Sequence, residues 1–279
     1  EAVVEKSGVL NLGVEGMMIT GAVIGFIFAV NTQTPIYGFI CAAIAGALLS
    51  VLFAVLTQYI MSNQVATGLG LTMVGLGLSA LIGKPYEGIK SPTLSKIEIP
   101  ILSDIPILGP MIFSHDAIVY FSVILVATVA FVISKTRIGL VLRAVGENQD
   151  AAHALGYKVI RIRFLAIMFG GATAGIGGAY ISLARVPQWT EGMTAGAGWV
   201  GLAPVVFASW KPWRVLLGAY LFGGITVLQL NLQAIGVAIP VEILSMSPYL
   251  VTIVVLVGIS LFGHHTAPGS LARPFHASQ

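Results

Sequence analysis

Two polar side chains stand at the start of the first apolar stretch of the sequence, on either side of a glycine. Asn11 and Glu15 flank Gly13, and Gly16 follows at once. A carboxylate and an amide exchange hydrogen bonds readily, and a helix interrupted by glycine can line a cavity within a membrane. An ionised Glu15 at the bilayer centre costs about 2.5–3.5 kcal/mol on insertion scales, so it should face water, pair or lie at an interface. Asn11 and Glu15 are therefore candidates for lining a solute path or its cytoplasmic gate; an interfacial glutamate near a helix start is the alternative.

Other polar and aromatic side chains lie within or beside apolar stretches and are further candidates for such a path. Amides and hydroxyls can bond to ribose or sugar hydroxyls, and an aromatic ring can offer its face to a base or sugar ring. Trp189, Trp210 and Trp213 are instead interpreted as interfacial anchors. The path candidates are Asn63, Gln64, Thr67, Thr72, Trp199, Gln229, Asn231, Glu242 and Tyr249.

No set of residues in the sequence points to catalysis. It has no Gly-x-x-x-x-Gly-Lys-Ser/Thr loop, whose amides and lysine would hold nucleotide phosphates. Metal-ligand spacing and a Ser/His/Asp set are also missing, and His264 beside His265 is better explained as part of a polar tail. We therefore expect no cofactor, no metal and no enzymatic activity in this chain, and no nucleic-acid partner.

The composition indicates that lipid surrounds most of the surface. Of the 279 residues, 57% are hydrophobic and only 9% are charged, where soluble domains carry about 25%. Long apolar runs predict an all-α, polytopic bundle, because lipid-exposed strand edges would leave backbone groups unpaired. We expect one transmembrane domain over 1–279 with about eight spans. They lie at roughly 16–31, 36–60, 64–82, 117–134, 164–185, 197–210, 213–232 and 247–263, and the short 197–210 could be re-entrant or broken.

The distribution of basic residues predicts the orientation. The segment 135–163 carries six lysines and arginines against Glu147 and Asp150, so it should be cytoplasmic. The N-terminus as given and the C-terminus then also lie inside. The proline-rich loop 83–116 lies outside, and its prolines argue against a long helix there.

A short helix bounded at both ends is predicted in the cytoplasmic segment between Arg143 and Gly156. Asn148 suits an N-cap and Gly156 a C-terminal stop. Ala151, Ala152 and Leu155 would form a small apolar face. Such a helix can dock into a groove of a partner protein, or simply rest on lipid headgroups.

Several motifs, in order along nearly the whole chain, resemble permeases of ATP-binding cassette (ABC) importers for branched-chain amino acids, simple sugars and nucleosides. The segment 143–156 resembles their coupling-helix region, and Ser7 to Met17 (Ser-Gly-Val-Leu-Asn-Leu-Gly-Val-Glu-Gly-Met) is similar to the start of the nucleoside and simple-sugar branch. Further matches are Asn63-Gln-Val, Gly196 to Ala203 and Ile239 to Tyr249. Thr72 and Met73 stand where that branch has asparagine and leucine, and the helix that normally precedes the opening motif is missing.

The resemblance implies a complex with ATP-binding subunits, a second permease (identical or different) and an extracytoplasmic solute-binding protein in the bacterial plasma (inner) membrane. It assigns coupling to the ATP-binding subunit to Arg143, Gly146, Glu147, Asn148, Ala151, Ala152 and Gly156. The expected mechanism is alternating access for a small polar solute, with nucleosides or simple sugars favoured. A branched-chain amino acid permease is one alternative. An ion-coupled secondary transporter is another, although Glu15 alone is a possible intramembrane acid; a membrane enzyme or a channel fits less well.

Overall fold

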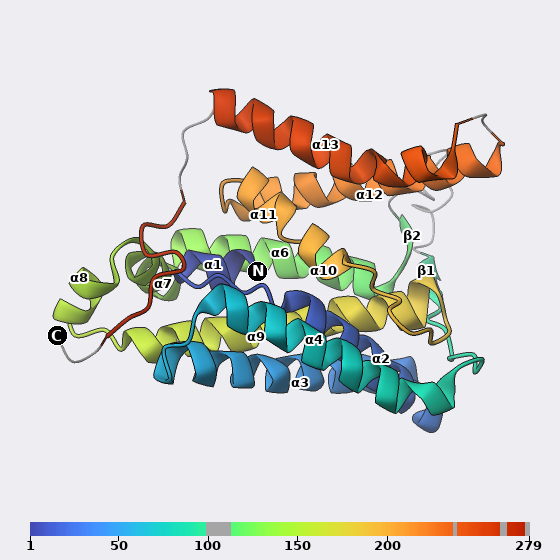
Figure 1. The fold of residues 1–279 in the computed structure, drawn as a ribbon, viewed down its shortest axis with the longest axis horizontal. Coiled ribbons are helices and arrows are strands. Elements are labelled where there is room, and N and C mark those ends of the chain that lie inside the picture. Colours follow the sequence, from blue (N-terminus) through green and yellow to red (C-terminus); the bar gives the residue numbers. More distant parts are fainter. Residues whose placement is uncertain (99–112, 237–238, 263–266, 277–279) are drawn as a thin grey trace.

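The computed structural model describes residues 1–98, 113–236, 239–262 and 267–276. Long helices run along the longest axis of the molecule, and short elements gather at its two ends (Figure 1). The first half contains α1 (Ala2–Lys6), α2 (Val14–Thr32), α3 (Pro35–Ala54), the π-helical turn η1 (Val55–Tyr59), α4 (Gln64–Gly83), the 3-10 turn η2 (Lys84–Tyr86) and the strands β1 (Lys96–Glu98) and β2 (Ser114–Asp116). The second half contains α6 (Ala117–Lys135), α7 (Arg137–Glu147), α8 (Gln149–Ala154), α9 (Val159–Tyr180), the π-helical turn η3 (Ile181–Arg185), α10 (Ala197–Val200), α11 (Ala203–Phe207), α12 (Pro212–Ala234) and α13 (Val241–Phe262).

The prediction of a helical membrane bundle is confirmed. Among the described residues, six helices are long and apolar enough to cross a membrane: Val14–Thr32, Pro35–Tyr59, Gln64–Tyr86, Ala117–Lys135, Val159–Arg185 and Pro212–Ala234. These match six of the expected spans within a few residues. A seventh expected span, 247–263, falls on α13, which has 22 residues.

The expected span 197–210 is not a continuous helix. It is divided into α10 and α11, of four and five residues, and ends at Ser209 and Trp210, which both adopt left-handed backbone angles. A segment of two short helices cannot supply the roughly 20 residues that a crossing needs. The count of about eight spans is therefore not confirmed.

Close packing among α2, α3 and α9 forms the centre of the bundle. A Cβ atom added to Gly21 would stand 2.3 Å from the Cα of Gly175 on α9, and one added to Gly46 on α3 would meet the Gly171 carbonyl oxygen at 2.2 Å. Small residues let helix backbones approach where lipid gives no hydrophobic drive for association. These glycines therefore allow α2, α3 and α9 to pack closely.

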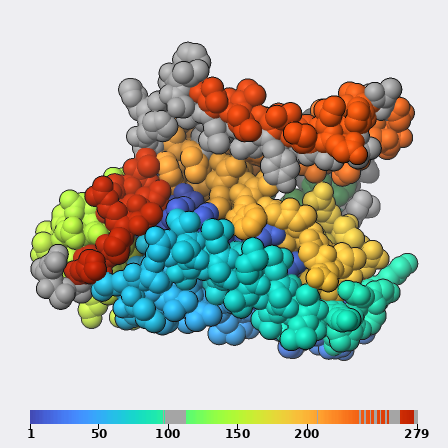
Figure 2. Space-filling model, viewed as in Figure 1, coloured from blue at the N-terminus to red at the C-terminus, as the bar shows by residue number. Residues whose placement is uncertain are grey.

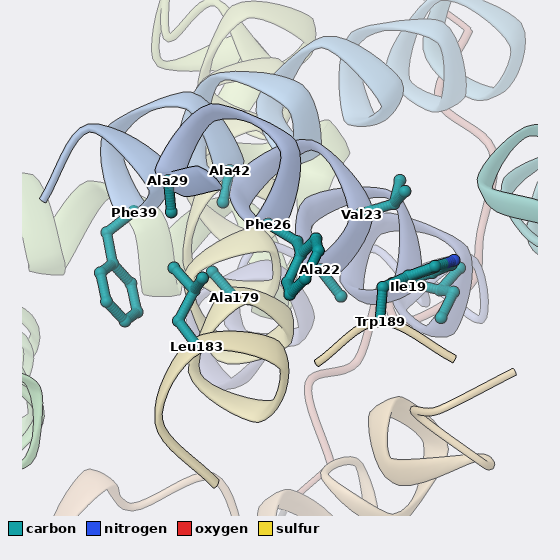
Figure 3. Close-up of a cluster of buried hydrophobic side chains, with 10 residues drawn as sticks. All are labelled: Ile19, Ala22, Val23, Phe26, Ala29, Phe39, Ala42, Ala179, Leu183 and Trp189. Carbon is teal, nitrogen blue, oxygen red and sulfur yellow. The ribbon is translucent and has the colours of Figure 1, made fainter. Parts of the chain in front are cut away.

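The residues of α2 from Ile19 to Ala29 contribute to the main apolar core. Phe26 and Val23 of α2, Phe39 of α3 and Leu183 of η3 belong to one cluster of buried side chains, and Trp189 lies at the end of the cluster opposite Phe39 (Figure 3). Trp189 is only 1% exposed and Trp210 only 6%, so the interpretation of these two as interfacial anchors is wrong. Trp213, 56% exposed, is the one of the three that remains on the surface.

The two ends of the bundle are built differently. At one end lie α7, α8 and the C-terminal residues; at the other lie β1 and β2, an antiparallel pair in register Ile97 to His115 (Figure 1). The loops expected inside and outside the cell thus occupy opposite ends. Within the described part of 83–116, the helical structure is the three-residue η2, while 99–112, with Pro100, Pro106 and Pro110, lie outside the described residues.

Candidate functional site

The carboxylate of Glu15 connects two parts of the chain in which helical structure begins after irregular backbone: the start of α2 and the segment that leads into α10. One oxygen accepts hydrogen bonds from the Thr194 hydroxyl (2.6 Å) and the Gly196 amide (2.9 Å), and the other accepts from the Gly198 amide (2.6 Å). Glu15 lies in the first turn of α2 and is 3% exposed. The burial of a carboxylate is tolerable because its two oxygens receive three donors. Glu15 therefore fastens the start of α10 to the start of α2.

Glycines make this approach possible. Gly196 has a φ of +83°, which L side chains rarely adopt, and the backbone that follows this turn directs the amides of Gly196 and Gly198 toward the carboxylate. A Cβ on Gly198 would lie 2.7 Å from the Cα of Glu15. The run Gly196 to Ala203, singled out in the sequence, thus brings two backbone donors onto an acid 181 and 183 residues away.

The interrupted stretch before α2 is held by side chains rather than by helical hydrogen bonds. Asn11 is fully buried, and its oxygen accepts from the Gly13 amide at 3.0 Å. The Leu12 carbonyl accepts from the Thr72 hydroxyl (3.2 Å) and from the Trp199 indole nitrogen (2.9 Å). The Gln64 side chain accepts from the Leu10 amide at 2.9 Å. Backbone groups lacking helical partners are satisfied in this way, as burial requires.

We call this meeting of residues 10–15, residues 64–72 of α4 and residues 194–199 the junction. It brings together Asn11, Glu15, Gln64, Thr72 and Trp199 of the predicted path residues. Trp199 remains 38% exposed although its nitrogen is bonded, so part of its ring faces outward. The other four are buried and make the hydrogen bonds described above, but Nε2 of Gln64 is buried without a hydrogen-bond partner.

The remaining predicted path residues do not gather at the junction. Asn63 is exposed and caps α4 through its bond to the Ala66 amide (3.0 Å), and Thr67 is half-buried against Ser62 at 2.7 Å. Glu242 is exposed in the first turn of α13. Tyr249 also lies on α13, where its side chain is outside the described part. Asn231, on α12, donates to the Val227 carbonyl of its own helix.

The predicted short helix of the cytoplasmic segment is present as α8. The Asn148 side chain accepts from the Ala151 amide at 3.0 Å, and Gly156 has a φ of +89°, so the expected N-cap and stop are both found. The expected apolar face is divided, however. Ala152 is 2% exposed and points into the protein, whereas Ala151 is exposed and Leu155 is 76% exposed.

The residues before α8 form the end of α7, a separate amphipathic helix. Gly146 is buried, and a Cβ there would lie 2.0 Å from the Lys6 carbonyl oxygen. Arg143 donates to the Gly139 carbonyl at 3.4 Å, while Glu147 is exposed. Burial lowers the pKa of Lys6, and Lys211 and Arg143 act in the same direction, while Glu147 raises it. Charges from three separate segments therefore meet beside the start of α8.

Two features of this end were missed by the sequence reasoning. The first is the bond from the Trp210 indole to the Glu5 carboxylate (2.5 Å), which links α1 to the turn before α12. Burial raises the pKa of Glu5 to about 7; the Glu1 charge adds to this rise, and the Trp210 bond opposes it. The second is Arg163, fully buried and bonded to three backbone carbonyls. A lone glutamate in a five-residue helix carries no sequence signal, but an arginine at the start of an apolar span does.

Comparison with known proteins places these features in a family. Residues 1–259 match the family model described as the branched-chain amino acid transport system / permease component. The chain is 37% identical over 278 residues to a putative glucose ABC transporter permease of Haloferax volcanii. This alignment covers 92% of this chain and 84% of the relative. The chain is 33% identical to a nucleoside ABC transporter permease of Lactococcus lactis (90% and 84% covered) and 32% identical to a guanosine ABC transporter permease of Bacillus subtilis (97% and 89%). No solved structure is significantly similar to this chain.

The match extends from α1 into α13, so it includes the junction, α7 and α8. Permeases of this family are transport subunits, not enzymes, and work with ATP-binding subunits in a membrane. The chain belongs to the branched-chain amino acid transport system / permease component family and is a multi-pass membrane permease subunit of an ABC transporter.

Proposed function

We propose that the chain moves nucleosides or simple sugars into the cell. The opening motif at 7–17 favours that branch, and the relatives named above are described as glucose, nucleoside and guanosine permeases. The observation that carries the proposal is the outward-facing ring of Trp199 at the junction. Its nitrogen is already bonded to the Leu12 carbonyl, so the ring offers a face rather than a donor. A flat ring face suits a base or a pyranose and gives little to a branched aliphatic side chain.

The proposed complex pairs the domain 1–279 with a second permease, identical or different, in the bacterial plasma (inner) membrane. The end that carries α8 faces the cytoplasm, as do the N-terminus as given and the C-terminal residues. The end that carries β1 and β2 faces an extracytoplasmic solute-binding protein. The basic residues of 135–163 support this orientation.

In this mechanism, ATP-binding subunits dock on α8 and move it as they close. The coupling segment consists of Arg143, Gly146, Glu147, Asn148, Ala151, Ala152 and Gly156. Its exposed members are Glu147, Asn148, Ala151 and Gly156, with Leu155 exposed beside them, whereas Gly146 and Ala152 are buried and support this surface from inside. The bundle alternates between two packings, and the ATP-binding subunits bias the equilibrium between them. Asn11 and Glu15 lie in the solute path or at its gate, and Asn63, Gln64, Thr67, Trp199, Glu242 and Tyr249 contribute to it.

Uptake by purified permease, reconstituted in liposomes with its ATP-binding subunits and solute-binding protein, tests the proposal. Labelled guanosine, ribose, glucose and leucine are compared with and without ATP. We expect ATP-dependent uptake of guanosine or a sugar, reduced at least tenfold by Trp199→Ala and unchanged by Trp213→Ala, whose ring is also exposed. Leucine uptake alone would identify a branched-chain amino acid permease. Uptake driven by an ion gradient without ATP would identify a secondary transporter, and either result would overturn the proposal.

A further inference from the structure

The C-terminal residues 267–276, which we call the C-terminal strap, lie along α7 and α8. The Ser270 amide donates to the Gly146 carbonyl at 2.8 Å, and the Gln149 amide, first in α8, donates to the Ser270 hydroxyl at 3.1 Å. The Gln149 side chain donates to the Pro274 carbonyl at 2.9 Å. Figure 2 shows the strap (red) against α7 and α8 (green). It lies beyond residue 259, where the family match ends.

An aromatic anchor fixes the far end of the strap. Phe275 is 5% exposed and packs with Val145 of α7, Ala152 of α8 and Val159 of α9. Its ring meets the His153 ring edge-on, with centroids 5.2 Å apart. The inward face of α8 is therefore completed by the strap, and the opposite face of α8 stays free for a partner. Between α8 and the strap lies a pocket of about 490 Å³.

Arg163 ties the strap to the N-terminal part of the chain. Its Nε donates to the Ser7 carbonyl at 3.1 Å, its Nη1 to the Arg273 carbonyl at 3.1 Å, and its Nη2 to the Ser270 carbonyl at 3.4 Å. A guanidinium holds its donors in a rigid fork, so these three carbonyls are fixed relative to one another. Lysine, with one rotatable ammonium, cannot reproduce this fork.

Arg163 and the three carbonyls that it holds, which we call the clamp, include a tight turn near the N-terminus. Gly8 has a φ of +89°, and a Cβ there would lie 2.6 Å from Nη2 of Arg163. The Gly8 carbonyl accepts a hydrogen bond from the Ala272 amide of the strap at 3.1 Å. The turn leads within three residues to Asn11 and then to the Leu12 carbonyl, which holds Trp199. A continuous series of contacts therefore runs from α8, through the strap and Arg163, to the junction.

We propose that the C-terminal strap and Arg163 are the positioning elements through which displacement of α8 reaches the junction. Docking alone would move α8; the clamp makes the Ser7–Gly8 turn move with it. The inference rests on the proposed function, because α8 must receive the motion of an ATP-binding subunit. Coupling of this kind needs a demonstrated response at both ends, not only a chain of contacts.

Two variants and a matched control test the proposal. Arg163→Lys keeps the charge and removes the fork, and Phe275→Ala removes the anchor, whereas Arg161→Lys makes the same exchange at an exposed position of the same helix. In liposomes with ATP-binding subunits, solute transported per ATP hydrolysed is measured. We expect it to fall at least tenfold in Arg163→Lys and Phe275→Ala, with ATP hydrolysis retained, and to stay unchanged in Arg161→Lys. Unchanged ratios in both test variants would overturn the proposal.

Hydrogen exchange separates this inference from the proposed function. In the permease alone, we expect faster amide exchange at 7–9 and 145–152 in Arg163→Lys and Phe275→Ala; exchange equal to wild type would contradict the clamp. With ATP-binding subunits and a non-hydrolysable ATP analogue, wild-type protein should respond at α8 and at 194–199, and the variants at α8 only. A response at 194–199 in the variants would also overturn the inference. If amide exchange at α8 of the wild-type protein does not change when the ATP-binding subunits are added, the docking role of α8 is wrong. Amide exchange in the permease alone would still show whether the clamp exists.

Discussion

Glu15→Gln removes the charge that fastens α10 to α2 and keeps the shape of the side chain. In wild type the carboxylate accepts three hydrogen bonds, two of them from the backbone of the α10 start. The amide oxygen of glutamine can still accept from Thr194 and Gly196. Its NH₂ group then faces the Gly198 amide, donor against donor, and that buried N–H loses its partner.

The size of the effect follows from these contacts. A hydrogen bond to a charged group contributes about 1.5–3 kcal/mol, and leaving a buried donor unpaired costs about 1–3 kcal/mol. The two energies describe the same lost contact and are not added. We therefore expect the free energy needed to detach α10 from α2 to fall by about 2–3 kcal/mol. Since about 1.4 kcal/mol is a factor of ten, amide exchange at Gly198 should accelerate about 30- to 150-fold. ATP-driven uptake should fall with it if the junction gates the solute.

Exchange and uptake are measured on the same purified protein, with Glu191→Gln as the control. Glu191 lies in the same segment and is exposed, so its exchange and uptake should match wild type. Wild-type exchange at Gly198 in Glu15→Gln would refute the anchoring role. Faster exchange with uptake at the wild-type rate and affinity would retain the anchor but remove Glu15 from the solute path and its gate.

Three further outcomes are expected. Gly21→Ala should lower the thermal unfolding midpoint in detergent, because overpacking typically costs about 1–3 kcal/mol, whereas Gly77→Ala, with open space around it, should not; equal midpoints would contradict the α2 packing. Glu147→Lys and Gly156→Pro should uncouple ATP hydrolysis from uptake, the second because proline cannot adopt the φ of +89° found there; normal coupling with normal assembly would count against docking at α8. Burial raises the pKa of Glu5 from 4.5 to about 7, so its contribution to stability is complete below pH 4.5 and is lost as the pH rises through 7. Glu5→Gln should therefore flatten the fall in stability between pH 4.5 and 7. A dependence of stability on pH identical to that of wild type would show that Glu5 does not titrate in this range.

Much of the fold could be predicted because its causes are local. Six membrane helices follow from apolar runs of about 20 residues, whose backbone groups bond within each helix. The cap at Asn148 and the stop at Gly156 depend on neighbours within four residues. The break within 197–210, one of the alternatives that the sequence left open, is also local in origin. The run is apolar enough, but Gly196, Gly198 and Gly201 favour breaks over a continuous helix, and its 14 residues are short for a crossing.

The roles of individual polar residues depended on contacts that sequence does not encode locally. The sequence marked Asn11, Glu15 and Trp199 as unusual and offered Glu15 three environments: water, an interface or a partner. Only the folded chain selected the partner, because amide donors come from residues 179 or more positions away. Every residue except proline has a backbone N–H donor, so the sequence pattern does not indicate which amides will bond to Glu15.

The sequence by itself determined that this is a bundle of membrane helices, where its basic segment lies along the chain, and which family it belongs to. Apolar length and charge placement are properties of consecutive residues, and they decide what the bilayer accepts. The tertiary structure alone decided that Glu15 fastens α10, that Trp189 and Trp210 are buried, and that Arg163 joins the strap to the first turn. Buried polar groups must find partners wherever the packed chain supplies them, and here the partners come from distant segments.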